Sequence, residues 1–235
     1  MPVSRTWSPL DRLSVDQVEL LRAFERLLVL ANKRVNLVSR PSIDDIRHVH
    51  TLHSLALSVR EFPSGSTVVD WGTGGGLPGI PLAIRFPHVR FVLVDSIEKK
   101  TDLVRAMVMK LGLENVDVER SRAETWEGTC DFAVSRATAP LARLWLWTHR
   151  VLGDLPDTMS GHTDSVWNCG LLTLKGGDLA SEIRELRKVD PGVQVDVTPI
   201  SEFAEGPFED KFIVEVRRRM SDVGCRTSKI WRPNV

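Results

Sequence analysis

A glycine-rich loop after a short apolar segment constrains the fold of this chain more than any other feature. The stretch VVDWGTGGGLPGIPLAI spans residues 68–84 and holds two overlapping glycine patterns. Gly72, Gly74 and Gly76 fit G-x-G-x-G, whereas Gly74, Gly76 and Gly79 fit G-x-G-x-x-G, the spacing of dinucleotide-binding loops. Glycines in the first turn after a strand let the backbone approach a ligand closely. The loop therefore predicts an α/β domain whose ligand has an adenosine end.

The sequence beyond this loop alternates between apolar strands and helices. Strands are expected at TVVDW (67–71), RFVLVD (90–95), VDVER (116–120), CDFAVS (130–135) and GLLTL (170–174). Helices are expected between them, at 80–86, 97–111, 140–152 and after Gly177. This alternation indicates a mostly parallel sheet covered on both faces. Two later strands, 193–200 and 211–219, have a connection too short for a crossover helix, so the last strand should be antiparallel.

Helical periodicity predicts a small N-terminal cap before the sheet. Ser14 and Gln17 fit a capping box, and apolar residues then recur at helical spacing to about Ala31. A second helix is expected from about Ile43 to Val59, and FPSGS after it is typical of a linker. We therefore expect a helical cap (1–62), a ligand-binding α/β domain (63–219) and a basic C-terminal tail (220–235).

Charge and cysteine content narrow the class of protein. Residues 1–60 hold nine basic and six acidic residues, and residues 217–235 hold six and one, whereas residues 61–216 are net acidic. Basic ends permit contact with a polyanion, although a solvated surface explains them equally well. Three widely spaced cysteines suit a reducing cytosol, and no apolar run is long enough to span a membrane. We expect a cytoplasmic protein without a membrane partner.

The residues around the glycines favour one ligand. A P-loop is excluded because Ile80 and Pro81 stand where it needs Lys and Ser or Thr. A nicotinamide dinucleotide fits the spacing, but Pro78 and Pro81 remove backbone donors from the turn that should receive its pyrophosphate. Asp70 is well placed for an α-amino group and a sulfonium, which S-adenosylmethionine carries. Asp95 suits the ribose of either cofactor. S-adenosylmethionine is favoured; a dinucleotide and a tight turn without ligand stay open.

The loop and several further motifs resemble the bacterial glucose-inhibited division protein B family (GidB or RsmG). D-x-G-x-G-x-G followed by L-P-G-I-P-L resembles its cofactor loop. RVNLVS, HTLHSLAL, LVDSIEKK, SRAE, VSRATAPL and LLTLKGG resemble its other motifs, in order, over about residues 15–187. The resemblance implies a Rossmann-like class I S-adenosylmethionine-dependent methyltransferase that modifies N7 of a guanine in 16S ribosomal RNA. The loop at 153–168 is longer than expected, and the tail has no counterpart.

The resemblance also implies roles for single residues. Cofactor binding is expected at Asp70, Gly72, Gly74, Gly76, Leu77, Asp95, Ala123, Glu124 and Arg136. Within this set, Gly72 and Leu77 should lie against the cofactor, whereas Asp70, Gly74 and Gly76 should shape its pocket. Arg136 is also the expected catalytic residue, because it ends the fourth strand and faces the transferring methyl; it could touch the cofactor or the guanine, and the family pattern favours the cofactor. Contacts with RNA are expected at Asn36, His50, Ser54 and Lys175.

The sequence lacks an obvious catalytic dyad, and methylation of guanine N7 does not require one. Guanine N7 has an exposed lone pair, so its methylation needs no base and relies on positioning. His50 and His53 share a helix face, but without a third ligand they make a poor zinc site, so no metal is expected. The expected partner is 16S ribosomal RNA or the small ribosomal subunit, and nothing demands more than a monomer.

Three other functions stay open on sequence grounds. The chain could be an S-adenosylmethionine-dependent methyltransferase for another RNA or a small molecule. Only substrate tests can distinguish these acceptors from 16S ribosomal RNA. It could be an NAD-binding oxidoreductase, which Asp70 and the prolines oppose. It could also be a non-catalytic RNA-binding assembly factor, which would bind RNA tightly and leave it unmodified.

Overall fold

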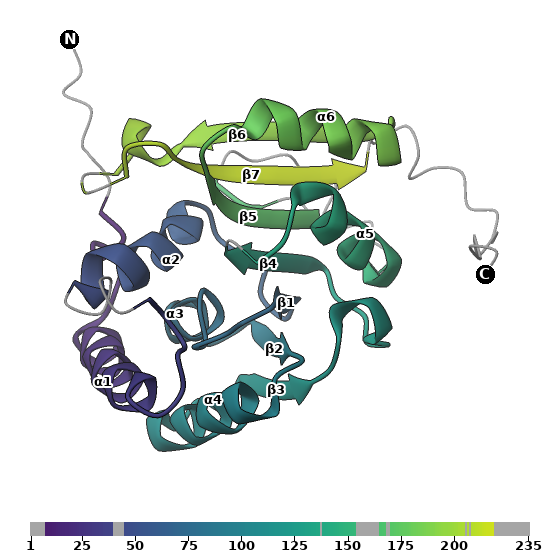
Figure 1. Cartoon of the computed structure of the whole chain (residues 1–235). Coiled ribbons are helices and arrows are strands. Elements are labelled where there is room, and N and C mark those ends of the chain that lie inside the picture. Colours follow the sequence, from purple (N-terminus) through teal and green to yellow (C-terminus); the bar gives the residue numbers. More distant parts are fainter. Residues whose placement is uncertain are drawn as a thin grey trace, which may run out of the picture.

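A twisted sheet forms the centre of the molecule (Figure 1). The computed structural model describes residues 8–39, 45–136, 138–153, 165–167, 170–204, 206 and 208–218. Within these residues seven strands form one sheet in the order β3-β2-β1-β4-β5-β7-β6. Their bounds are β1 Thr67–Trp71, β2 Arg90–Asp95, β3 Val116–Arg120, β4 Phe132–Arg136, β5 Gly170–Gly176, β6 Val193–Pro199 and β7 Lys211–Arg218. The predicted strands are confirmed, apart from shifts of one or two residues at their ends.

Strand directions place the candidate site. β1 pairs in parallel with β2 on one side and with β4 on the other, so the strand order reverses at β1. β7 is antiparallel to both β5 and β6, which confirms the predicted direction of the last strand. In sheets of this kind, ligands bind beyond the carboxyl ends of the strands at the reversal point. The end of β1 is followed directly by the glycine loop.

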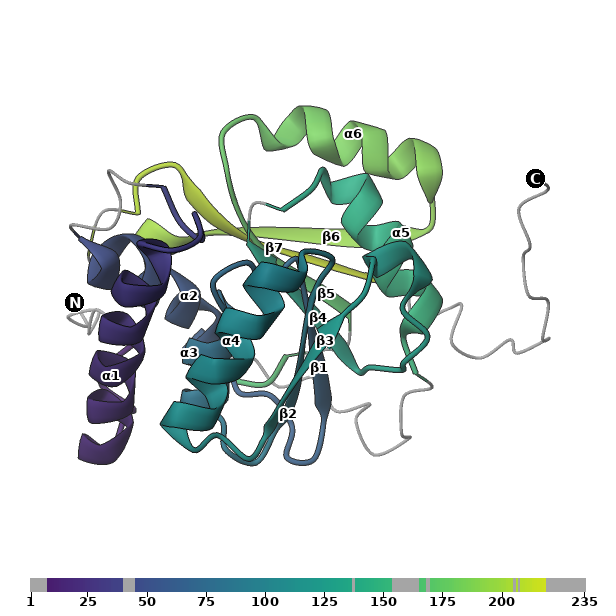
Figure 2. The same cartoon turned by 60° about the horizontal axis from the view of Figure 1, so that its bottom comes forward.

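Helices cover both faces of the sheet, as Figure 2 shows. α1 (Val15–Asn32), α3 (Gly79–Arg85) and α4 (Glu98–Leu111) share one apolar cluster with one sheet face, whereas α5 (Leu141–Val151) and α6 (Leu179–Val189) pack in a second cluster. Val68 and Val69 belong to different clusters, since neighbouring strand residues point to opposite faces. The Rossmann-like, mostly parallel α/β architecture is confirmed.

The N-terminal helices belong to the same core as the sheet. Ser14 and Gln17 form the predicted capping box, and the Gln17 amide also donates to the carbonyl of Ile84 at 2.7 Å, which ties α1 to α3. The second helical segment ends at Val59 as predicted. It is a π-helix over η2 (Arg47–Leu52), an α-helical turn over α2 (His53–Leu55) and a 3-10 turn over η3 (Ala56–Val59). Its expected start at Ile43 lies outside the described residues.

The first residue of the expected linker is part of the core. Phe62 is buried and meets Phe86 and Phe132 edge to face, with ring centroids 5.2 Å apart in each pair. The boundary after residue 62 therefore does not separate two apolar cores, and it stays a prediction as a division of function. Of the 153–168 loop, Trp167 is described and buried, and its indole donates to the carbonyl of Leu57 at 2.8 Å. The tail at 220–235 lies outside the described residues.

Two short 3-10 segments complete the described elements: η4 (Ala123–Thr125) after β3, and η6 (Ile200–Glu202) after β6. None of the helices in the described ranges is both long and apolar enough to cross a membrane.

Candidate functional site

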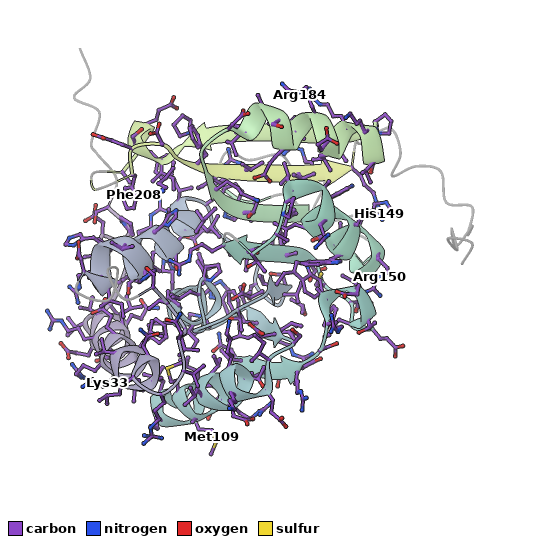
Figure 3. The ribbon with its side chains drawn as sticks, viewed as in Figure 1. Lys33, Met109, His149, Arg150, Arg184 and Phe208 are labelled. Atoms are coloured by element: carbon purple, nitrogen blue, oxygen red, sulfur yellow. The ribbon has the colours of Figure 1, made fainter. Side chains whose placement is uncertain are left out.

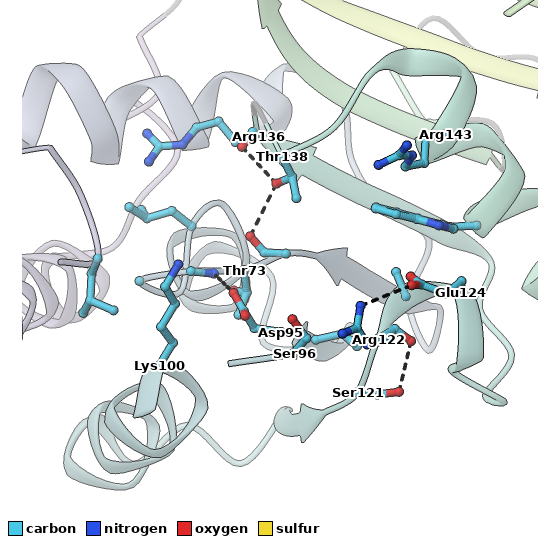
Figure 4. Close-up of a pocket in the computed structure, with 18 residues that line it drawn as sticks. Thr73, Asp95, Ser96, Lys100, Ser121, Arg122, Glu124, Arg136, Thr138 and Arg143 are labelled. Atoms are coloured by element: carbon cyan, nitrogen blue, oxygen red, sulfur yellow. Dashed lines mark hydrogen bonds and ion pairs between the residues drawn. The ribbon is translucent and has the colours of Figure 1, made fainter. Parts of the chain in front are cut away.

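A pocket lies at the carboxyl ends of β1, β2, β3 and β4 (Figure 4). Its cavity volume is about 530 Å³, within the range of small-molecule sites. The glycine loop forms one wall, and the residues after β2 and β3 form another. The predicted residues on the lining are Gly72, Gly74, Leu77, Asp95, Ala123, Glu124 and Arg136. The structure thus brings most of the predicted cofactor-binding residues to one cavity.

Asp70 shapes the glycine loop from beneath. Its Oδ2 accepts hydrogen bonds from the hydroxyl of Thr73 at 2.7 Å and from the backbone amide of Gly79 at 3.0 Å. The side chain is fully buried and is not on the pocket lining. Burial raises the pKa of Asp70 to about 7, and the two hydrogen bonds oppose that rise. This position supports the predicted shaping role, but not a direct contact between Asp70 and a cationic ligand.

The loop backbone depends on glycine at Gly72 and Gly76. Both have positive φ angles, 67° and 86°. A Cβ atom at Gly72 would overlap the side chain of Thr138, and one at Gly76 would overlap Ile80. Gly76 lies behind the lining, so like Asp70 it acts on the pocket through the shape of the loop.

Asp95 ends β2 and lines the pocket beside the loop. Its two carboxylate oxygens accept hydrogen bonds from the amides of Gly74 at 3.0 Å and Ile97 at 2.9 Å. The residue is only 9% exposed, and burial together with the two hydrogen bonds fixes the orientation of its side chain. A carboxylate oxygen can accept more than one hydrogen bond, and Asp95 can therefore also receive ligand hydroxyls.

Arg136, at the end of β4, is joined to the N-terminal cap. Its Nη1 lies 2.7 Å from Nδ1 of His50 and donates to the carbonyl of Val49 at 3.4 Å. Burial, and secondarily the charge of Arg136, lowers the pKa of His50 to about 4, so its imidazole is neutral at neutral pH and Nδ1 can accept. Burial lowers the pKa of Arg136 to about 10, which leaves the guanidinium charged at neutral pH. His50 thus orients the cation that faces the pocket.

Three of the four residues expected to bind RNA are buried: His50, which holds Arg136, and also Lys175 and Ser54. The Lys175 ammonium donates to the carbonyl of Ala139 at 2.7 Å and to Glu182 at 2.8 Å, and its side chain is 7% exposed. Ser54 is fully buried and donates to the carbonyl of His50 at 2.8 Å. The positions of these three residues do not support direct RNA contacts, since their side chains have little or no surface open to RNA. Asn36 is exposed, and its RNA contact stays a prediction.

Sequence reasoning missed several residues of the lining. Lys100 and Thr138 lie within motifs that resembled the family, yet only their neighbours were assigned roles. Arg143 and Trp147 lie on α5, which was expected from the sequence only as a helix that covers the sheet. The additional lining residues are Leu37, Thr73, Gly75, Val94, Ser96, Lys100, Ser121, Arg122, Thr138, Arg143 and Trp147.

The described part of the chain contains no set of side chains that could bind a metal ion. No three His, Cys, Asp or Glu side chains converge there as a metal ion requires. His53 lies on the cap helix with its ring 6.1 Å from that of Phe208, and burial lowers its pKa to about 3. The absence of a metal stays an expectation.

Comparisons with known proteins identify relatives of this chain. A family profile described as rRNA small subunit methyltransferase G (GidB) matches residues 17–160. The ribosomal RNA small subunit methyltransferase G of Salinibacter ruber is 46% identical over 213 residues, which cover 90% of this chain and 97% of that protein. The protein of the same name from Flavobacterium psychrophilum is 40% identical over 209 residues, covering 88% and 92%.

Among solved structures, the precorrin-6y C5,15-methyltransferase of Geobacter metallireducens resembles this chain with a TM-score of 0.52. The likeness covers 72% of this chain and 88% of that one, at 13% sequence identity. At that identity it shows a shared fold.

Proposed function

The chain belongs to the rRNA small subunit methyltransferase G (GidB) family, and from this membership we propose that it methylates N7 of a guanine in 16S ribosomal RNA with S-adenosylmethionine. The observation that carries the proposal is the pocket at the reversal point of the sheet. There the glycine loop, Asp95 and Arg136 converge from β1, β2 and β4.

The pocket fits the proposed cofactor. Asp95 would hold the ribose hydroxyls, and the backbone around Ala123 would hold the adenine at the side next to β3. Gly72 and Gly74 leave the loop wall without side chains beside the amino-acid end. When bound, S-adenosylmethionine supplies an electrophilic methyl group attached to a positively charged sulfur.

The protein's own part in the reaction is positioning. Guanine N7 offers a lone pair, so no side chain has to remove a proton. Arg136 projects from β4 with its guanidinium held by His50, and it orients either the cofactor or the O6 edge of the guanine while N7 stays free. Lys175 and Glu182 fix the segment after β4, through the carbonyl of Ala139. Methyl transfer then relies on a rigid, prealigned site.

The geometry argues against a nicotinamide dinucleotide. A dinucleotide places its pyrophosphate on free backbone N–H groups at a helix N-terminus. Here the amide of Gly79, the first residue of α3, already donates to Asp70, and that of Ile80 donates to the carbonyl of Gly76. Those donors are used within the loop itself.

The cofactor and the acceptor are tested separately. Calorimetric titration should show binding of S-adenosylmethionine and none of NAD; the reverse result would refute the methyltransferase assignment. The acceptor is tested by methyl transfer to small-subunit RNA, with large-subunit RNA as the control. We further propose that the protein works as a monomer, and that it does so in the cytoplasm, where ribosomal RNA is found. A defined dimer in analytical sedimentation would contradict the monomeric state.

A further inference from the structure

The pocket lining carries more positive than negative charge. Among the described residues, Lys100, Arg122, Arg136 and Arg143 are the cations of the lining, and Asp95 and Glu124 are its carboxylates. Asp95 is already bonded to two backbone amides of the loop and of the residue before α4. The lining thus holds two more cations than carboxylates.

The four cations fall into two groups. The first group has internal partners: Nη1 of Arg122 lies 3.7 Å from Oε1 of Glu124 in an ion pair. Arg136 is hydrogen-bonded to His50 and to the carbonyl of Val49. Within the described ranges, Lys100 and Arg143 take part in no ion pair and no side-chain hydrogen bond. The surplus is therefore concentrated at these two residues.

The cofactor does not account for this surplus. S-adenosylmethionine carries an ammonium, a sulfonium and a carboxylate, so it too has a net positive charge. Its carboxylate can neutralise one cation of the lining, but the ligand as a whole adds to the excess. A site built for the cofactor alone would be expected to gather carboxylates. The charge points to a second ligand that is an anion.

Lys100 and Arg143 lie on opposite sides of the cavity. Lys100 belongs to the first turn of α4, after β2, and Arg143 belongs to the first turn of α5, after β4. Figure 4 shows the two side chains on either side of the pocket, with Asp95 and Ser96 between them. An anion that contacts both must extend across the opening.

We propose that Lys100 and Arg143 bind the phosphates on either side of the target guanosine, so that single-stranded RNA crosses the pocket mouth from α4 to α5. The proposal rests on the proposed function and adds the path of the substrate. A base extruded between two anchored phosphates points into the cavity, where the methyl donor is held. Lysine and arginine contacts to phosphate also supply affinity that is independent of sequence.

The test measures how RNA affinity depends on salt. Lys100→Gln, Arg143→Gln and the double variant are compared with Arg184→Gln. Arg184 is exposed on α6, at the far edge of the molecule (Figure 3), so its change is a matched loss of one charge. Dissociation constants for small-subunit RNA are measured at several salt concentrations, and S-adenosylmethionine affinity is measured by calorimetry.

Each single change should lower the slope of log affinity against log salt by about 0.7, and the double variant by about twice as much. Arg184→Gln should leave the slope unchanged. An unchanged slope in the double variant would overturn the proposal. Loss of S-adenosylmethionine affinity with a wild-type RNA slope would also overturn it, because the residues would then serve the cofactor's carboxylate. If wild-type protein binds RNA but transfers no methyl group, the proposed function fails, and the slopes still decide the RNA path.

Discussion

The Oδ2 atom of Asp70 lies 3.0 Å from the amide nitrogen of Gly79, and this hydrogen bond joins the end of β1 to the first residue of α3. The same oxygen accepts from Thr73, within the glycine loop. The other oxygen, Oδ1, is buried and has no hydrogen-bond partner in the described part of the chain. One carboxylate thus holds both ends of the loop that forms the cofactor wall.

Replacing Asp70 with alanine should collapse this arrangement. The variant leaves the buried amide of Gly79 without an acceptor, which costs about 1–3 kcal/mol. We expect a lower free energy of unfolding in urea and loss of S-adenosylmethionine binding. Asp117→Ala is the control, since it removes only an exposed ion pair with Arg90 on the edge of the sheet. Normal cofactor affinity in folded Asp70→Ala protein would disprove the role of the carboxylate.

Asp70 should also give the stability an unusual pH dependence. Burial raises its pKa from 3.8 to about 7, so between these values the folded state holds a proton that the unfolded state has released. The contribution of Asp70 to the free energy of unfolding is therefore greatest below about pH 4 and falls as the pH rises toward 7. His50 and His53, whose pKa values are lowered, act in the opposite direction over part of this range.

The contribution of Asp70 is isolated by comparing wild type with Asp70→Asn, because both proteins keep the histidines. The amide does not titrate, so the stability of wild type relative to the variant should decrease from pH 4 to pH 7. A constant difference over that range would contradict the raised pKa.

His50 should affect turnover more than cofactor binding. A hydrogen bond to a charged group is worth about 1.5–3 kcal/mol, so a misplaced Arg136 should slow methyl transfer by roughly 10- to 150-fold in His50→Ala. His50→Asn, whose amide oxygen can replace Nδ1 as acceptor, should restore part of the rate. His48→Ala is the control, because His48 is half-exposed on the same segment and pairs with Asp45. Equal losses in the alanine and asparagine variants would show that His50 acts only by packing.

Lys175 should matter for stability and not for RNA contact. Lys175→Met leaves Glu182 without its cation. Removing one partner of such a pair should lower the free energy of unfolding by about 3 kcal/mol. This is the lower end of the range for buried pairs, because Glu182 keeps some contact with water. Lys188→Met, which breaks the exposed pair with Glu185 on the same helix, should cost less than about 1 kcal/mol. RNA affinity of the folded Lys175→Met protein should equal that of wild type. Reduced RNA affinity at unchanged stability would restore Lys175 as an RNA contact.

The fold could be predicted from the sequence because its central strands are nearly continuous apolar runs with clear helical segments between them. Besides small shifts at strand ends and two short 3-10 segments, the helix types of the second cap segment and the burial of Phe62 differed from expectation. An exposed linker was expected because FPSGS contains turn residues, but the aromatic ring of Phe62 fills the core beside Phe86 and Phe132. Local composition does not reveal such long-range packing.

The site was only partly predictable. The sequence placed Gly72, Gly74 and Asp95 at the pocket, since strand ends and the reversal point determine their position. It could not show that Asp70 turns inward, because that depends on the amide of Gly79. Nor could it show that Lys175 is neutralised by Glu182, because the pairing forms only when α6 packs behind the segment after β4.

The basic tail offers a further check on the RNA surface. Residues 220–235 hold three basic residues and one acidic residue. If the tail binds phosphates, its removal should weaken RNA binding and lower the salt slope by up to about 2. Filter binding over a range of salt concentrations measures both effects. An unchanged slope would remove the tail from the RNA-binding surface.

The most direct measurement is methyl transfer from labelled S-adenosylmethionine to small-subunit RNA from cells that lack this gene. Intact small subunits and large-subunit RNA are tested in parallel, and the product nucleoside is identified by mass spectrometry. The account predicts one 7-methylguanosine, confined to small-subunit RNA. Binding of the cofactor without transfer to any small-subunit substrate, or a modified nucleoside other than 7-methylguanosine, would contradict it.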